Sequence, residues 1–265
     1  MSILEAPSRN RLLDIYQLMM GMSFGVENPN IIGMPSVDIE AVRDLPLFVE
    51  MAAANFVELM QAAYLQRFPP HVQLIGEGEP ADFLYVIVEG CVEMFAETKE
   101  RRSTIELIQP VSTFIAAATL KDAPYLMSAR TTERSRLLLI PSKDIRVMFE
   151  RDPGFARSMV HEQATAYRSL VRTLKNQKLR TSVERLANYL LSAHSAQGAT
   201  GALTLAIDKR TLAALLGMTP ENLSRAFGTL KPYGVSVVGA DIRLSKLAEL
   251  ETFAKPTPLI DGRDS

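Results

Sequence analysis

The sequence predicts an α+β protein in which an antiparallel β-structure precedes a mainly helical C-terminal part, and three observations indicate this fold class. Between residues 72 and 141, short apolar runs alternate with glycine-containing corners, as in "FLYVIVEGCVEMF". From Phe155 to Leu179 neither glycine nor proline interrupts the chain. The stretch "LAALLGMTPENLSRAF" at 212–227 has the pattern of two helices joined by a tight corner. Several strands of five to seven residues at close spacing indicate an antiparallel barrel or sandwich.

The first 41 residues are predicted to be an N-terminal extension. They contain one short helical pattern, at Arg11–Met22, and then the turn-rich stretch "GVENPNIIGMPSVD". From Val42 onward, apolar residues recur at spacings of three and four, which predicts short helices ahead of the strands. We therefore expect residues 42–152 to form the first domain.

A long helix is predicted at residues 153–179, because Pro153 suits the first turn of a helix. Along it, one set of residues recurs at the alternating spacings of four and three that define a heptad seam. A helix packed on its own domain is the alternative, but the length and the narrow seam favour a homodimer interface. The expected interface residues are Ala156, Val160, Gln163, Tyr167, Leu170 and Leu174.

The corner at Gly217 predicts a helix-turn-helix. Glycine permits the left-handed backbone that ends the first helix, Thr219 can cap the second, and Pro220 suits its first position. Leu223, Ala226 and Phe227 then face the core. The opposite side is suited to base edges in the major groove, Arg225 to guanine and Glu221 to cytosine. Such a helix pair is also a common packing unit, but the hairpin pattern "VSVVGADIRL" after it favours a winged DNA-binding domain. The expected DNA-binding residues are Thr219, Glu221, Asn222, Ser224 and Arg225.

Amino-acid composition constrains the function less strongly than the sequence motifs do. Residues 176–265 hold 11 basic against 8 acidic residues, while the whole chain has a net charge of −1, so the C-terminal part is the one suited to an anionic partner. No apolar run approaches a membrane span, and no secretory signal is visible. The single cysteine excludes an internal disulfide framework. We expect a cytoplasmic protein that has no membrane partner.

Taken together, "GEGEPADFLYVIVEGCVEMF", the long helix, "LAALLGMTPENLSRAFGTLKPYGV" and the hairpin resemble the Crp–Fnr family of bacterial transcription regulators over residues 42–252. The resemblance implies a cyclic-nucleotide-binding-type β-roll (a double-stranded jelly roll) at 42–152. It also implies a dimerisation helix at 153–179, a winged helix-turn-helix at 180–254 and a flexible tail at 255–265. Glu221, Ser224 and Arg225 are similar to the Fnr-type recognition motif, which implies palindromic double-stranded DNA sites with TTGA-like halves. RNA polymerase is the further partner that the family implies.

The chain departs from the family pattern at two places that determine which ligand or cofactor the regulator senses. The Fnr branch carries a cysteine cluster before the β-roll, and this chain has none there, so an iron–sulfur cluster is not expected. The cyclic-AMP branch carries Gly-Glu and Arg-Ser pairs where this chain has Ile115-Ala116 and Tyr125-Leu126. Arg130, five residues along a regular strand, is expected on the opposite face from Tyr125 and is therefore a poor substitute for the missing arginine. The candidate effector-pocket residues are Phe114, Ile115, Ala116, Ala117, Tyr125 and Leu126.

The cofactor is left open by the sequence. His71, His161, His194 and Cys91 are the candidates for haem or metal ligation, but no ligand spacing links them, and no metal site is predicted. No nucleophile–base pair or phosphate-binding loop indicates an enzyme.

The first hypothesis is a homodimeric DNA-binding regulator whose signal is not cyclic AMP. The alternative is a haem- or small-molecule-sensing regulator that acts mainly through protein contacts; a third, an enzyme's regulatory subunit, leaves the winged domain unexplained. We expect an activator, with a repressor as the alternative; the sequence leaves this choice and the target genes open.

Overall fold

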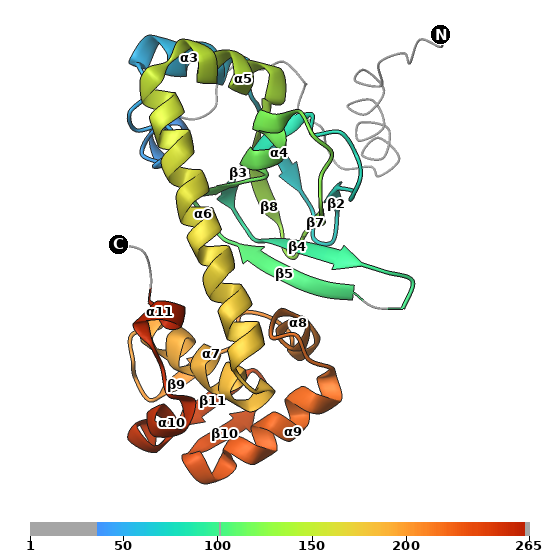
Figure 1. Cartoon of the computed structure of the whole chain (residues 1–265), viewed down its shortest axis with the longest axis vertical. Helices are drawn as coiled ribbons and strands as arrows, with labels where there is room; N and C mark the ends of the chain where they lie inside the picture. The colour runs from blue at the N-terminus through green and yellow to red at the C-terminus, as the bar shows by residue number, and fades with distance from the viewer. Residues whose placement is uncertain (1–35, 101, 263–265) are drawn as a thin grey trace.

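The computed structural model describes residues 36–100 and 102–262, so the predicted extension, including its helix at Arg11–Met22, falls almost entirely outside the described residues. The chain is elongated, with a β-sheet domain at one end and a smaller helical domain at the other (Figure 1). A single long helix, α6, runs between them along the length of the molecule. None of the helices in the described part of the chain is long and apolar enough to cross a bilayer.

The first domain contains two four-stranded antiparallel sheets, as the strand patterns predicted. The strand order in one is β1-β8-β3-β6 and in the other β2-β7-β4-β5. A short helix, α4 (Ala116–Lys121), follows β6. The strands are β1 (Tyr64–Phe68), β2 (Gln73–Ile75), β3 (Phe83–Glu89), β4 (Val92–Glu97), β5 (Arg102–Ile108), β6 (Ser112–Phe114), β7 (Ser128–Thr131) and β8 (Ser135–Pro141).

Strand β3 is apolar on both faces because it separates two cores. Alternate residues of a strand point to opposite faces of its sheet. Leu84, Val86 and Val88 accordingly belong to a helix-covered core, whereas Tyr85 and Ile87 belong to the interior between the two sheets. The uninterrupted apolar run "LYVIV" follows from this double burial.

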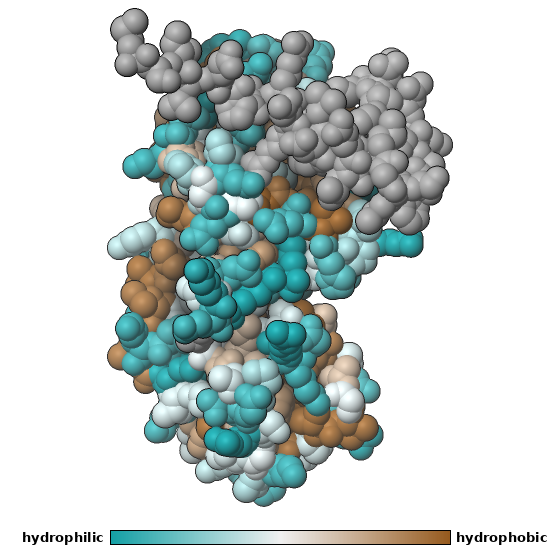
Figure 2. Space-filling model, turned by 90° about the vertical axis from the view of Figure 1, so that its right-hand side faces the viewer, coloured by the Kyte–Doolittle hydropathy of each residue, from teal (hydrophilic) through white to brown (hydrophobic). Residues whose placement is uncertain are grey.

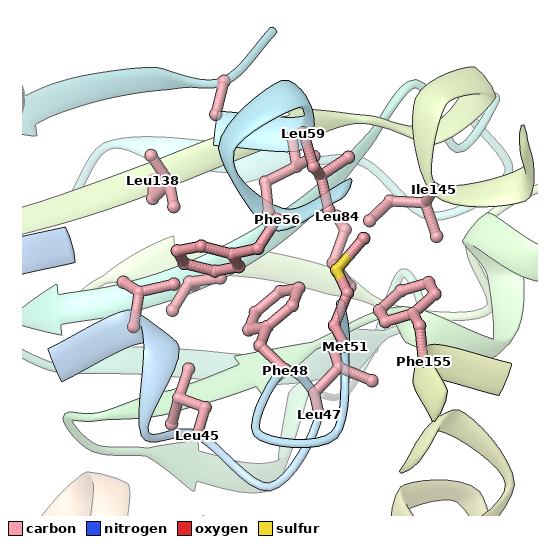
Figure 3. Packing of buried hydrophobic residues seen from close by; sticks show 14 of the residues in the cluster. Leu45, Leu47, Phe48, Met51, Phe56, Leu59, Leu84, Leu138, Ile145 and Phe155 are labelled. Atoms are coloured by element: carbon pink, nitrogen blue, oxygen red, sulfur yellow. The ribbon is translucent and has the colours of Figure 1, made fainter. Parts of the chain in front are cut away.

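Helices α2 (Ser36–Arg43), α3 (Ala53–Gln61) and α5 (Ser142–Arg151) form the helix-covered core together with the start of α6. Phe48 is its centre (Figure 3). Its ring stacks on Phe155 with the ring centroids 5.9 Å apart, and it meets the edge of Phe56 at 5.8 Å. This packing fixes the first turn of α6 against the β-sheet domain.

Helix α6 spans Pro153–Leu179, the bounds expected for the long helix. Asp152 caps it by accepting from the Phe155 amide at 2.9 Å. The same carboxylate accepts from the Ala52 amide at 2.9 Å and from Nδ2 of Asn55 at 2.7 Å. Burial raises the pKa of Asp152, but these hydrogen bonds outweigh it and the pKa is lowered. The side chain is thus held ionised at the helix N-terminus, where a negative charge is favourable.

The C-terminal domain is built around one buried apolar cluster to which its helices and its small sheet contribute. The predicted hairpin is confirmed as β10 and β11, and a third strand, β9, which the sequence did not indicate, pairs with β11. Its elements are α7 (Ser182–Ala196), β9 (Ala202–Thr204), α8 (Lys209–Leu215), α9 (Pro220–Leu230), a 3-10 turn (Lys231–Tyr233), β10 (Val235–Val238), β11 (Asp241–Leu244) and α10 (Leu247–Ala254).

Residues 255–262 are the described part of the tail that the sequence predicts to be flexible. These residues contain a short helix, α11 (Pro258–Asp261), that lies against α6. Asp261 pairs with Arg180, 81 residues earlier in the chain. A pair of residues so far apart in the chain cannot be predicted from a local sequence pattern.

Candidate nucleic-acid interface and sensor domain

The corner between α8 and α9 has the geometry that its sequence predicted. Gly217 has a φ of 66°, in the left-handed region, and its amide donates to the Ala214 carbonyl as α8 ends. Thr219 precedes α9 in an extended conformation, and its hydroxyl accepts from the Asn222 amide at 3.2 Å. Thr219 is one of the predicted DNA-binding residues. Its hydroxyl oxygen has a structural role here, because it caps the N-terminus of α9.

Helix α9 presents a polar face to solvent. Leu223, Ala226 and Phe227 are buried in the domain core, as predicted. The remaining predicted DNA-binding residues on α9 are all exposed, namely Glu221, Asn222, Ser224 and Arg225. They lie in the first two turns of the helix, where a recognition helix meets base edges.

The acidic residue of this face is held ionised. The pKa of Glu221 is lowered by hydrogen bonds from its own amide and from the Thr219 side chain, and Arg225 adds a smaller electrostatic effect. An ionised carboxylate accepts hydrogen bonds only, which suits the amino group of cytosine.

Two basic residues at the start of α8 were not among the predicted DNA-binding residues. Lys209 and Arg210 are exposed and directly follow the cap residue Asp208. The Asp208 carboxylate accepts from the amides of Arg210 and Thr211 at 2.8 and 2.9 Å. The sequence signal was the run "DKRT", a capping residue followed by two cations, which is suited to phosphate contact.

The predicted seam on α6 is largely uncovered. Val160, Tyr167, Leu170 and Leu174 are 61%, 68%, 62% and 55% exposed, while Ala156 and Gln163 are half-buried. Val171, which the heptad count left out, is exposed beside them. Much of the surface in Figure 2 is hydrophilic with separate hydrophobic patches. The stripe on α6 is a row of large apolar side chains at helical spacing, and such a row normally marks an interaction site.

The six candidate effector-pocket residues do not line one common space. Phe114, Ala116 and Tyr125 are buried and Ile115 is half-buried, but Ala117 is exposed and Leu126 is 83% exposed. The prediction is wrong for Leu126, because the chain reaches strand β7 only at Ser128 and Leu126 lies in the turn before it.

Aromatic side chains occupy the interior between the two sheets near this position. The rings of Tyr85 and Phe114 are stacked with centroids 5.1 Å apart, and the Tyr125 hydroxyl donates to the Phe83 carbonyl at 3.4 Å. Tyr125 is 2% exposed. The interior beside Tyr125 is therefore packed with aromatic side chains.

The backbone turn ahead of α4 is strained at Ile115. Its φ is 70°, in the left-handed region that a β-branched residue rarely adopts. The resemblance aligns this position with the glycine of the Gly-Glu pair in the cyclic-AMP branch, and a glycine would adopt this φ without strain.

Arg130 is engaged elsewhere. Its Nε donates to Glu93 at 2.7 Å, and Arg102 contacts the same carboxylate at 3.3 Å. Glu93 is 2% exposed and also accepts from the Thr104 hydroxyl at 2.6 Å. Removing Arg130 from this cluster would leave a buried carboxylate less well compensated, so Arg130 is not a mobile phosphate ligand.

The histidines and the cysteine are not brought together. His71 and His161 are exposed on separate elements, and the buried His194 accepts from the Gly201 amide through Nε2 at 2.8 Å. Burial raises the pKa of the Cys91 thiol, which disfavours the reactive thiolate. Among the described residues, no three His, Cys, Asp or Glu side chains form a group able to hold a metal ion.

Comparison with known protein families identifies a domain in the N-terminal part of the chain and another in the C-terminal part. Residues 65–152 match the model of the cyclic nucleotide-binding domain, and residues 184–253 match that of the Crp-like helix-turn-helix domain. Helix α6 lies mostly between the two matched regions.

Two relatives are similar to parts of the chain. A Rhizobium leguminosarum bv. viciae protein named "Probable transcriptional activator" is 25% identical over 67% of this chain and 75% of its own length. A Rhodopseudomonas palustris protein named "Putative potassium channel protein" is 28% identical over 46% of this chain. The match spans only 30% of that channel protein.

Solved structures show the same fold. A "putative cAMP-binding regulatory protein" from Silicibacter pomeroyi is 26% identical, with a TM-score of 0.55 over 84% of this chain and all of that one. A Crp/Fnr-family regulator from Eubacterium rectale is 17% identical, with a TM-score of 0.66 over 80% of this chain and 99% of that one.

Proposed function

Since the chain belongs to the Crp–Fnr family of transcription regulators, we propose that it acts as a homodimer that reads palindromic DNA through α9. The exposed polar face of α9 is the observation that carries this proposal. Glu221, Ser224 and Arg225 form the Fnr-type spacing, so TTGA-like half-sites are the proposed target. Family membership supports two further parts of the proposal, contact with RNA polymerase and action in the cytoplasm.

The dimer proposal depends on the α6 stripe. Tyr167, Leu170 and Leu174 expose apolar surface that a second α6 would cover. Pairing two such helices places their recognition helices on one face of the DNA, about 34 Å apart for adjacent major-groove half-sites. A palindromic site is the expected consequence, because the symmetry of the protein is then matched by that of the DNA.

The signal proposed is one other than cyclic AMP. A cyclic phosphate needs a fixed cation and the ribose needs an acceptor. Tyr125 and Ala116 stand at two of those positions, and Arg130 is held by Glu93. The Silicibacter pomeroyi protein with the same fold is described as a putative cAMP-binding regulator, so cyclic AMP is the first ligand to test on this chain.

The function is tested by mobility shift with a duplex that contains two TTGA-like half-sites, beside one in which both halves are scrambled. The expected result is a shifted complex with the intact duplex at protein concentrations that leave the scrambled duplex free. Equal binding to both duplexes would refute sequence-specific reading. If neither duplex binds, regulation mainly through protein contacts becomes the favoured function.

A further inference from the structure

The connection between α6 and the C-terminal domain consists of two extended residues. Helix α6 ends at Leu179 and α7 begins at Ser182, with Arg180 and Thr181 at ψ values of 143° and 161°. Thr181 caps α7 through a reciprocal pair of hydrogen bonds with Glu184. Such a short extended link defines no angle between two helices, so contacts around it must set that angle.

Residues 255–262, which we call the strap, make such contacts with α6. The Arg180 guanidinium donates to both carboxylate oxygens of Asp261, at 2.6 and 2.5 Å. The Arg180 side chain is only 7% exposed, and Nη1 also donates to Asn176 at 3.2 Å. One turn earlier, Nζ of Lys175 donates to the Leu259 carbonyl at 3.3 Å. Figure 1 shows α11 beside the lower part of α6.

At its other end the strap is fixed to the C-terminal domain. It continues directly from α10, and Nδ2 of the buried Asn188 on α7 donates to the Ala254 carbonyl at 2.8 Å. Lys255 lies 3.9 Å from the Glu184 carboxylate, also on α7. The strap therefore bridges the hinge, with one end on α6 and the other on α7.

The attachment to α6 is polar. Leu259 is 72% exposed, and a hollow of about 350 Å³ between α6 and α11 is lined by Thr165, Ser169, Arg172, Thr173 and Asn176 together with residues 260–262. With little apolar surface buried there, the Arg180–Asp261 pair is the main anchor. A bidentate arginine–carboxylate pair is strong and geometrically specific.

The strap does not compete with the proposed dimer interface. Leu174 belongs to the apolar stripe, while Asn176, which lines the hollow, is two residues further on and so about 200° around the helix. The matched family region ends at residue 253, before the strap begins. The strap thus lies outside the part of the chain that the family model describes.

We propose that the strap is a hinge clamp. Together with the Arg185 contacts to Leu216 and Arg180 and the packing of α8 against β5, it fixes the angle between α6 and the DNA-binding domain and thereby pre-organises the recognition helix. Its effect on DNA affinity rests on the proposed function, whereas its effect on the hinge does not. The Asp261 carboxylate accepts from the Thr257 amide at 2.7 Å as well as from Arg180. Burial raises the pKa of Asp261, but the Arg180 pair and the Thr257 amide lower it further, so the clamp is charged at neutral pH.

The test is hydrogen exchange followed by mass spectrometry on Asp261→Asn. Glu249→Gln is the matched control, because it breaks an exposed pair with Lys246 (3.1 Å) within the same domain and makes no contact with α6. We expect amides at 176–186 to exchange about tenfold faster in Asp261→Asn, while those of α9 are unchanged. DNA affinity should fall about three- to tenfold through lost pre-organisation. A chain that stops after Ala254 should reproduce both effects.

Three results would overturn the clamp. One is hinge exchange in Asp261→Asn equal to that of the control. Another is faster exchange that extends equally through α9, which would make the strap a general part of the domain fold. The third is a looser hinge with unchanged DNA affinity. If the wild type binds no DNA at all, the proposed function fails, and the hinge exchange still decides whether the clamp exists.

Discussion

Gln177, near the end of α6, lies directly against Gly217 at the corner of the helix-turn-helix. A Cβ atom at Gly217 would be 2.7 Å from Oε1 and 3.1 Å from Nε2 of Gln177. Arg185 strengthens the same junction, because its Nε donates to the Leu216 carbonyl and its Nη1 to the Arg180 carbonyl, both at 2.8 Å. The end of the long helix is therefore in contact with the corner that orients α9.

Gly217→Ala should weaken DNA binding through this contact. The left-handed φ alone costs about 1–2 kcal/mol of folding stability in a non-glycine residue, and the Gln177 side chain must also move. Gly198→Ala is the matched control, since Gly198 also has a positive φ (91°) but nothing within 4 Å of its Cβ position. Urea unfolding should show similar stability losses for both variants, while fluorescence anisotropy shows weaker DNA binding for Gly217→Ala alone. Gln177→Ala added to Gly217→Ala should recover affinity; no recovery would assign the loss to the backbone.

The parts of this fold that could be predicted are those encoded locally. The corner at Gly217, the cap at Thr219 and the start of α6 at Pro153 each depend on residues within one turn of each other. The alternation of apolar residues likewise indicated the antiparallel strands.

Long-range contacts explain what the sequence could not show. Pro256 and Pro258 break regular structure and so predict a loose tail, but Asp261 in this tail pairs with Arg180 across the hinge. Alignment with the Arg-Ser pair of the cyclic-AMP branch predicts Leu126 as a pocket residue, yet Leu126 lies in an exposed turn before β7. Strand β9 has three residues, too few to produce a pattern.

Leu170→Glu should convert the proposed dimer into a monomer. The substitution places a charge without an evident partner in the apolar stripe of α6, where burying it is unfavourable. Light scattering should report the monomer mass, and affinity for a palindromic site should fall with it. His161→Glu is the control and should remain dimeric, because His161 is exposed and lies nine residues, about 180° around the same helix, from Leu170. A wild-type monomer that still binds the palindrome tightly would refute the interface.

Cyclic AMP should not bind. Tyr125 is buried where a phosphate-binding arginine would be needed, and Arg130 is paired with Glu93. Calorimetric titration with cyclic AMP, and separately with cyclic GMP, should give no heat of binding. A ligand at 100 times its Kd would stabilise the fold by about 2.7 kcal/mol. A rise of several degrees in Tm with millimolar cyclic AMP would therefore contradict this reading of the sensor domain.

Sequence-specific reading by α9 is the central element of the proposed function, and Arg225→Ala tests it most directly. Binding is measured at one fixed salt concentration on the TTGA-like palindrome and on duplexes with one base pair of each half-site substituted. Arg157→Ala, far from α9 and paired with Glu50 (3.3 Å), is the control and should bind like the wild type. We expect Arg225→Ala to lose about 1–3 kcal/mol of binding free energy on the preferred site and to stop discriminating at one base pair of each half-site. An equal loss on every duplex would show a phosphate contact instead and would contradict base reading by Arg225.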